Sequence, residues 1–177
     1  MEGARQFLSD QFSRKDTRDQ WLLKPIDMWL YFNQRLLSQR GVTADQVADA
    51  LAGWLRRQPA ILQAYTRAQL LAESPTHDPL QEKIRRSFFP ERSGDVAFVL
   101  KPYHLLYGRQ GTNHGTPHPY DTHVPLVVYG PGVKAGVYED LVTPQATASI
   151  LTQALGIPAP AGAKAAAPAG LLSSSGD

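Results

Sequence analysis

The 177-residue chain carries 18 lysine and arginine residues, 16 aspartate and glutamate residues, and no cysteine. This length can bury a substantial core in one domain, and the lack of cysteine excludes disulfides, thiolate metal sites and cysteine nucleophiles. A formal net charge of +2 gives no strong field for nucleic acid, so we expect no nucleic-acid partner.

The apolar pattern contains neither a signal sequence nor a membrane span. A span needs about 20 consecutive apolar residues, and no window of the chain approaches that length. We therefore expect no membrane partner, and the localisation of this chain stays open.

The first third of the chain mixes helical and strand-like patterns. Apolar residues at helical spacing predict a short amphipathic helix over residues 2–12. Two aromatic-rich runs, 21–23 and 28–32, are typical of strands. Thr43 followed by Gln46 forms a capping box and predicts a helix from about residue 44 to residue 57.

A second group of elements follows from residue 61. Residues 61–65 read as a buried strand, and Thr66 with Gln69 predicts a short helix directly after it. Asp78, followed by proline and two residues later by glutamine, predicts a helix that ends near Arg86.

Two apolar runs and a late helix complete the pattern. Residues 96–100 are almost continuously apolar, which suits a strand covered on both faces in a parallel or mixed sheet. Residues 126–129 predict another strand, and Thr143-Pro144 opens a helix that ends at Gly156. Alternating strands and helices indicate an α/β layer fold.

The last 20 residues differ in composition from the rest of the chain. Residues 158–177 consist mainly of alanine, proline, glycine and serine, which cannot offset the entropy of ordering. We therefore expect a folded segment over residues 1–157 and a flexible tail over residues 158–177.

Chemistry is expected in the stretch from Gly111 to Pro125, which holds three of the five histidines. Without cysteine, any metal must be held by nitrogen and oxygen. His114 and His118 are four residues apart, but the neighbouring prolines exclude the helical two-histidine zinc motif. Asp121 and His123 add donor atoms. The spacing by itself leaves metal binding open.

The same stretch resembles a known family. Residues 111–116, 120–126 and 130–132 are similar to the C-terminal site loop of the alkaline phosphatase superfamily. The branch they resemble is that of type I phosphodiesterases and nucleotide pyrophosphatases, with the zinc-dependent, phosphate-irrepressible alkaline phosphatases. Residues 92–102 and 142–157 resemble the flanking strand and helix.

This resemblance implies a fold, a reaction and roles for site residues. The implied fold is a partial alkaline-phosphatase-like one, with mixed or parallel strands flanked by helices. The family hydrolyses phosphate esters with a threonine or serine nucleophile and two zinc ions. His114 matches a zinc ligand. Asp121 and His123 match scaffold positions that would hold the loop and orient His114, whereas we expect His118 to be exposed and without a role.

The remaining family ligands have no match in this sequence. The family also uses an early aspartate, an Asp-x-x-x-His pair, an Asp-His pair and the nucleophile. No histidine here has an aspartate directly before it or four residues before it. We therefore expect the C-terminal part of a larger enzyme, from a truncated gene or an internal start. Alone it would be inactive, with at most one incomplete zinc site.

Two alternatives remain at this point. The chain could be an inactive remnant or interaction module that pairs with a separate N-terminal half through exposed sheet edges. It could instead be a small metal-binding protein that uses His114, Asp121 and His123. The sequence leaves open whether the parent cleaves monoesters or diesters. Family relatives are commonly exported, so we expect a periplasmic or exported parent.

Overall fold

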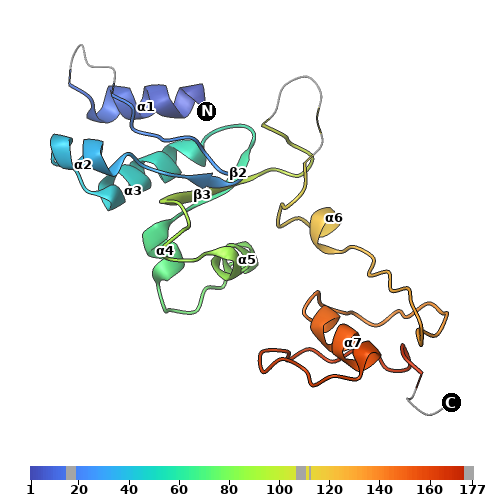
Figure 1. The fold of residues 1–177 in the computed structure, drawn as a ribbon. Helices are drawn as coiled ribbons and strands as arrows, with labels where there is room; N and C mark the ends of the chain where they lie inside the picture. Colours follow the sequence, from blue (N-terminus) through green and yellow to red (C-terminus); the bar gives the residue numbers. More distant parts are fainter. Residues whose placement is uncertain (15–18, 107–110, 112, 174–177) are drawn as a thin grey trace. The chain divides into compact units, whose positions relative to one another are not determined.

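The computed structural model describes residues 1–14, 19–106, 111 and 113–173, and the chain divides into two compact units (Figure 1). The units are Met1–Thr122 and His123–Asp177. The division expected at residue 157 stays a prediction. Thr112 of the histidine stretch and residues 174–177 of the expected tail lie outside the described residues. No helix in the described part is long and apolar enough to cross a membrane.

A three-stranded sheet forms the centre of the first unit. Its strands are β1 (Trp29–Leu30), β2 (Ile61–Thr66) and β3 (Val96–Leu100), in the order β1-β3-β2. Both pairings are antiparallel. The expected α/β class is confirmed, but the parallel or mixed pairing is not what the described strands show. A continuous apolar run indicates that both faces of a strand are covered. The direction of the neighbouring strands depends instead on the segments that connect them.

The side chains of β3 alternate between two hydrophobic clusters. Val96 and Phe98 belong to the larger cluster, which includes the apolar residues of α1 and α3. Ala97 and Val99 belong to a second cluster with Tyr65, Leu70 and Ile84. Figure 1 shows α1 and α3 on one face of the sheet and α4 and α5 on the other. The central strand is therefore covered on both faces, as its composition predicts.

Five helices of the first unit surround this sheet: α1 (Glu2–Phe12), α2 (Gln34–Arg40), α3 (Ala44–Leu55), α4 (Arg67–Leu71) and α5 (Pro79–Ser87). The capping boxes of Thr43 with Gln46 and of Thr66 with Gln69 are both formed. Asp78 accepts a hydrogen bond from the backbone of Leu80, as its position predicts. These local start signals therefore locate three of the helices correctly.

Helix α2 was not predicted from the sequence. Asn33 accepts a hydrogen bond from the Leu36 amide at the start of this helix, and Gly41 ends it in the left-handed conformation at φ 65°. Both are ordinary helix boundaries. The helix is short, and its start follows directly on the aromatic run that indicates a strand.

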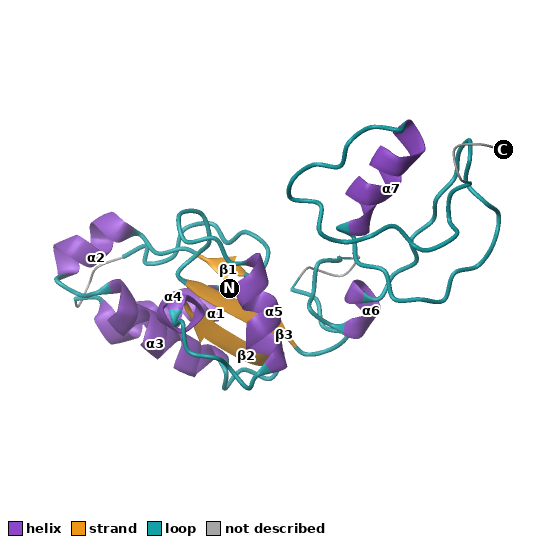
Figure 2. Cartoon of the chain, turned by 90° about the horizontal axis from the view of Figure 1, so that it is seen from below, coloured by secondary structure: helices purple, strands orange, loops and turns teal. Residues whose placement is uncertain are grey.

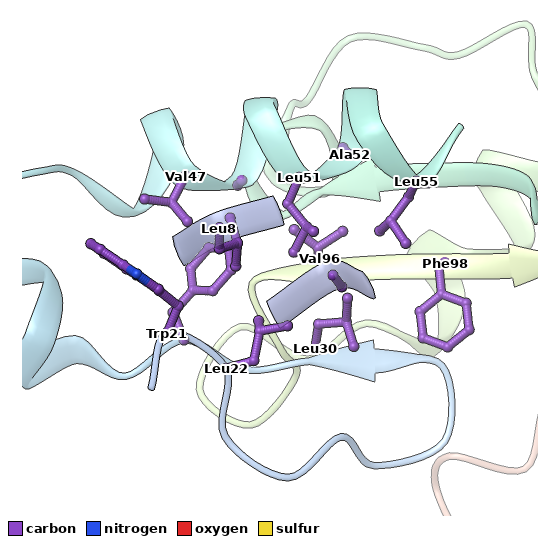
Figure 3. Packing of buried hydrophobic residues seen from close by; sticks show 14 of the residues in the cluster. Leu8, Trp21, Leu22, Leu30, Val47, Leu51, Ala52, Leu55, Val96 and Phe98 are labelled. Atoms are coloured by element: carbon purple, nitrogen blue, oxygen red, sulfur yellow. The ribbon is translucent and has the colours of Figure 1, made fainter. Parts of the chain in front are cut away.

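The apolar stripe of α3 anchors the larger cluster. Val47 and Leu51 have no exposed surface, and Trp21 of the preceding segment is 1% exposed (Figure 3). Burial of each such side chain contributes about 1.5–3 kcal/mol before the entropy of ordering is subtracted. The run at 21–23 joins the sheet region through a single antiparallel bridge, between Leu22 and Phe32.

The second unit is built around helix α7 (Ala146–Leu155), and Figure 2 shows that loops form most of its remainder. Gly156 ends α7 in the left-handed conformation at φ 63°, as predicted. Ala146 and Ile150 of the helix form a small buried cluster with Leu171. The flexibility expected of residues 158–177 stays a prediction, although Leu171 is 5% exposed.

The strand expected at residues 126–129 is not formed. These residues have no strand pairing in the described part of the chain, and Val127 and Tyr129 are 84% and 100% exposed. A strand forms only when a neighbouring backbone accepts and donates its hydrogen bonds. The apolar sequence favours a strand, but the described residues of the second unit supply no neighbouring strand for it.

Candidate functional site

The histidine stretch places His114 on an exposed loop of the first unit. Gly115 follows at φ 88°, a conformation that glycine adopts readily and other residues rarely adopt. The His114 imidazole has no hydrogen-bond partner among the described residues, so its ring nitrogens are available to a ligand. His114 also lines a cavity, together with Asn113 and Thr116.

Asp121 closes the loop by contacting Thr116, which lies two residues beyond His114. Its Oδ2 atom accepts hydrogen bonds from the Thr116 hydroxyl at 2.6 Å and from the Thr116 amide at 2.9 Å. These bonds lower the pKa of Asp121, with smaller contributions from the nearby charges of His114 and His118. Asp121 lies in the short helix α6 (Pro119–Thr122), so its carboxylate ties this helix to the backbone beside His114.

His118 is buried, which corrects the expectation that it is exposed and without a role. It is 7% exposed, and its Nε2–H donates to the Leu100 carbonyl at 2.8 Å. Its ring also stacks on Tyr120 at 5.3 Å, and Tyr120 stacks on Tyr103 at 5.0 Å. His118 therefore fastens the loop to the end of β3, because the fold brings residues 18 positions apart together.

A second attachment of the loop comes from helix α5. The Lys83 ammonium donates a hydrogen bond to the Pro117 carbonyl at 2.9 Å. The basic run from Lys83 to Arg86 would otherwise be read as a solvated helix face. Nothing in the local sequence reveals this contact, because the two segments are 34 residues apart.

The described residues do not form a complete metal centre. No group of three histidine, aspartate or glutamate side chains in the described ranges could hold a metal ion. His123 is exposed and belongs to the second unit, whereas His114 and Asp121 belong to the first. The independent metal site of His114, Asp121 and His123 would need residues of both units, so it stays a prediction. The exposed His114 imidazole offers the nitrogen donor of a single metal ligand.

The hydrogen bonds of Asp121 predict a pH-dependent loop. We expect the Thr116 contacts to be complete at neutral pH and to be lost as the pH falls through the lowered pKa of Asp121. This follows because a carboxyl with a depressed folded-state pKa stabilises the fold above its unfolded value of about 3.9 and loses that contribution in acid. Carbon-detected NMR of the Asp121 carboxyl would give its titration midpoint.

Thr116→Val supplies the matched variant for this titration. Removal of the Thr116 hydroxyl should move the titration midpoint of Asp121 to higher pH. Thr122→Val changes the neighbour of Asp121 in α6 and should leave that midpoint unchanged. Equal midpoints in the native chain and Thr116→Val would contradict the assigned role of the hydroxyl.

Both the sequence and the fold of this chain are similar to known proteins. No family model matches the chain. It is 25% identical over 137 residues to alkaline phosphatase PafA of Elizabethkingia meningoseptica, which covers 77% of this chain and 25% of that protein. It is 33% identical over 109 residues to alkaline phosphatase PhoK of a Sphingomonas species, which covers 54% of this chain and 19% of that protein.

The fold gives a consistent result. The crystal structure of wild-type alkaline phosphatase PafA matches with a TM-score of 0.82 at 23% identity, over 97% of this chain and 32% of that chain. The chain thus has the fold of part of an alkaline phosphatase, and its homologues include the alkaline phosphatases PafA and PhoK. It spans about a quarter of the PafA sequence.

Proposed function

We propose, from this relationship to the alkaline phosphatase superfamily, that the chain is the C-terminal part of a zinc-dependent phosphate-ester hydrolase and that His114 is one of its metal ligands. The observation that carries the proposal is the position of His114. Its imidazole is exposed, it directly precedes Gly115 at φ 88°, and it lies on a loop held by Asp121 and His118.

The proposed roles of the neighbouring residues are positional. Asp121 fixes the backbone beside His114 through Thr116, and this ordering would reduce the conformational entropy lost when the imidazole binds a metal. We also propose His123 as a supporting residue of the loop. A zinc ion bound by His114 would polarise a phosphoryl oxygen and stabilise the charge that develops on it.

The rest of the active site would come from outside this sequence. The proposed parent carries the nucleophile, the remaining ligands and a second zinc ion, since this chain matches about a quarter of PafA. The substrate would be a phosphate monoester or diester, as in the phosphodiesterase and nucleotide pyrophosphatase branch. We propose a periplasmic or exported location for the parent.

The purified 177-residue chain should show no zinc-dependent turnover of 4-nitrophenyl phosphate. The described residues supply one ligand and no group of three, so the chain should not hold a catalytic metal pair. Release of 4-nitrophenol with added zinc would be followed by absorbance. Turnover that His114→Ala abolishes and His77→Ala leaves unchanged would show that the chain contains a complete site.

A second candidate is an inactive interaction module that pairs with a separate N-terminal half. Two observations favour it. In the described part of the sheet, β2 pairs with β3 on one side and with no strand on the other. The apolar Val127 and Tyr129 also face solvent without a strand partner in the described part. Unpaired edges of this kind promote association.

Sedimentation velocity tests this candidate directly. If the exposed strand segment drives association, the chain should sediment as more than a monomer, and Val127→Lys should shift it toward the monomer. Lysine at the exposed Val137, in the same unit, is the matched control. A stable monomer at high concentration would count against the interaction module.

A further inference from the structure

A cavity of about 90 Å³ lies beside His114 within the first unit. We propose that it receives the apolar, aromatic group of a phosphate ester whose phosphoryl group lies at His114. This inference rests on the proposed function and names the substrate class: aryl esters in preference to small alkyl esters.

The cavity wall is mostly apolar and comes from separate segments. Met28 precedes β1, Phe98 and Leu100 belong to β3, and Leu105 and Leu106 follow that strand. Phe98 is 4% exposed and is held in the core, so this side of the cavity is fixed by packing. Leu105 and Leu106 are half exposed and would lose contact with water when a ring enters.

The size of the cavity suits an apolar ring better than a single water molecule. A water molecule requires about 10–15 Å³ and two to four polar partners, whereas apolar cavities of about 150 Å³ can remain dry and bind benzene. With a volume of about 90 Å³ and an open side, this cavity can accept part of one ring. Ligand sites commonly combine such an apolar wall with a few polar groups that fix orientation.

The polar residues of the wall determine which end of the ester enters. Asn113, His114 and Thr116 border the cavity where the loop passes it, and the Asn113 amide and the His114 imidazole can donate hydrogen bonds to a phosphoryl group. His104 and Asp27 also border it, and the Asp27 carboxylate disfavours a second anion. The phosphoryl group therefore stays near His114, and the uncharged ring occupies the apolar part.

The two methionines provide a direct test with the full chain. Met28 lines this cavity, whereas Met1 lines a different one beside Trp54. In chain labelled with ¹³C at the methionine methyl groups, 4-nitrophenol and phenyl phosphate should shift the Met28 signal saturably and leave Met1 in place. Methyl phosphate and inorganic phosphate should shift neither signal. Phenyl phosphate should also give ring-proton NOEs to the Met28 methyl group.

A blocking variant tests the position of the ligand. Leu105→Trp should fill the cavity and weaken 4-nitrophenol binding at least about tenfold, because the ring loses its buried surface. Leu71→Trp is the matched control, since Leu71 has similar exposure at the end of α4 and does not line the cavity. Far-ultraviolet circular dichroism and thermal melting would verify that both variants fold.

Three results would overturn the inference: no Met28 shift in folded chain, equal shifts of Met1 and Met28, or unchanged binding in Leu105→Trp. The titration requires neither metal nor turnover, so it is independent of the proposed hydrolysis. If the ring binds but the loop does not support catalysis, only the proposed function is overturned. A catalytically competent loop without a Met28 shift would overturn only the cavity assignment.

Discussion

Replacement of His114 by alanine should lower phosphatase activity at least about 100-fold when the loop is placed in an active host. The host is the PafA phosphatase of Elizabethkingia meningoseptica, with residues 111–125 of this chain in place of its matched segment. Loss of a residue that only orients a metal ligand costs about 10–100-fold, so loss of the ligand itself should cost at least the upper value. Initial rates with 4-nitrophenyl phosphate and measured zinc content would show the effect.

Controls within the same graft separate a ligand from its supports. Asp121→Asn should lower activity about tenfold or more, because a neutral amide oxygen accepts the two Thr116 hydrogen bonds more weakly than the charged carboxylate does. It should retain zinc better than His114→Ala. His123→Ala should have the smallest effect, since the exposed His123 shows no hydrogen bond within the described residues. Equal activity in the graft and its His114→Ala variant would refute the ligand assignment.

Gly94→Ala should destabilise the first unit by about 2–3 kcal/mol, the upper part of the range for overpacked cores. A Cβ atom at Gly94 would lie 2.5 Å from the Leu30 carbonyl oxygen and 3.1 Å from the Trp29 Cβ. Both neighbours belong to β1, so the relief of this clash requires a backbone shift. That shift would strain the hydrogen bond from the Asp95 amide to the Leu30 carbonyl, now 2.8 Å long.

Asp95 raises the cost of such a shift further. Its carboxylate accepts the Phe32 amide at 2.7 Å, so it joins the start of β3 to the end of the β1 segment. Burial raises the pKa of Asp95, although the Phe32 amide and the Arg67 charge oppose that change. A displaced Asp95 would leave a partly buried carboxylate with weaker hydrogen bonds.

Gly53→Ala is the matched control and should have the opposite sign. Its Cβ would meet only the end of the Arg57 side chain, at 3.7 Å, in the interior of α3. Alanine should therefore stabilise the unit by about 0.5–1 kcal/mol through helix propensity. Urea unfolding followed by tryptophan fluorescence reports on this unit alone, because Trp21, Trp29 and Trp54 all lie in it. Equal midpoints for the two variants would show that β1 moves freely away from residue 94.

Local signals in the sequence determined the starts of α3, α4 and α5, the central strand and the loop that carries the candidate ligand. The capping boxes at Thr43 and Thr66 are made of residues three positions apart, so their hydrogen bonds form within the helix they begin. The apolar run at 96–100 indicates a strand covered on both faces, which β3 is. The order of residues 111–126 indicates the superfamily, and the comparisons agree with it.

Tertiary structure alone decided which distant segments meet. His118 is buried because the fold brings it to the Leu100 carbonyl, and no pattern near His118 specifies that partner. The antiparallel order of the sheet, the cavity beside His114 and the exposure of residues 126–129 depend in the same way on neighbours far along the chain. Composition and spacing indicate which secondary structure a segment can form by itself. Contacts between distant segments depend on the path of the connections that bring them together.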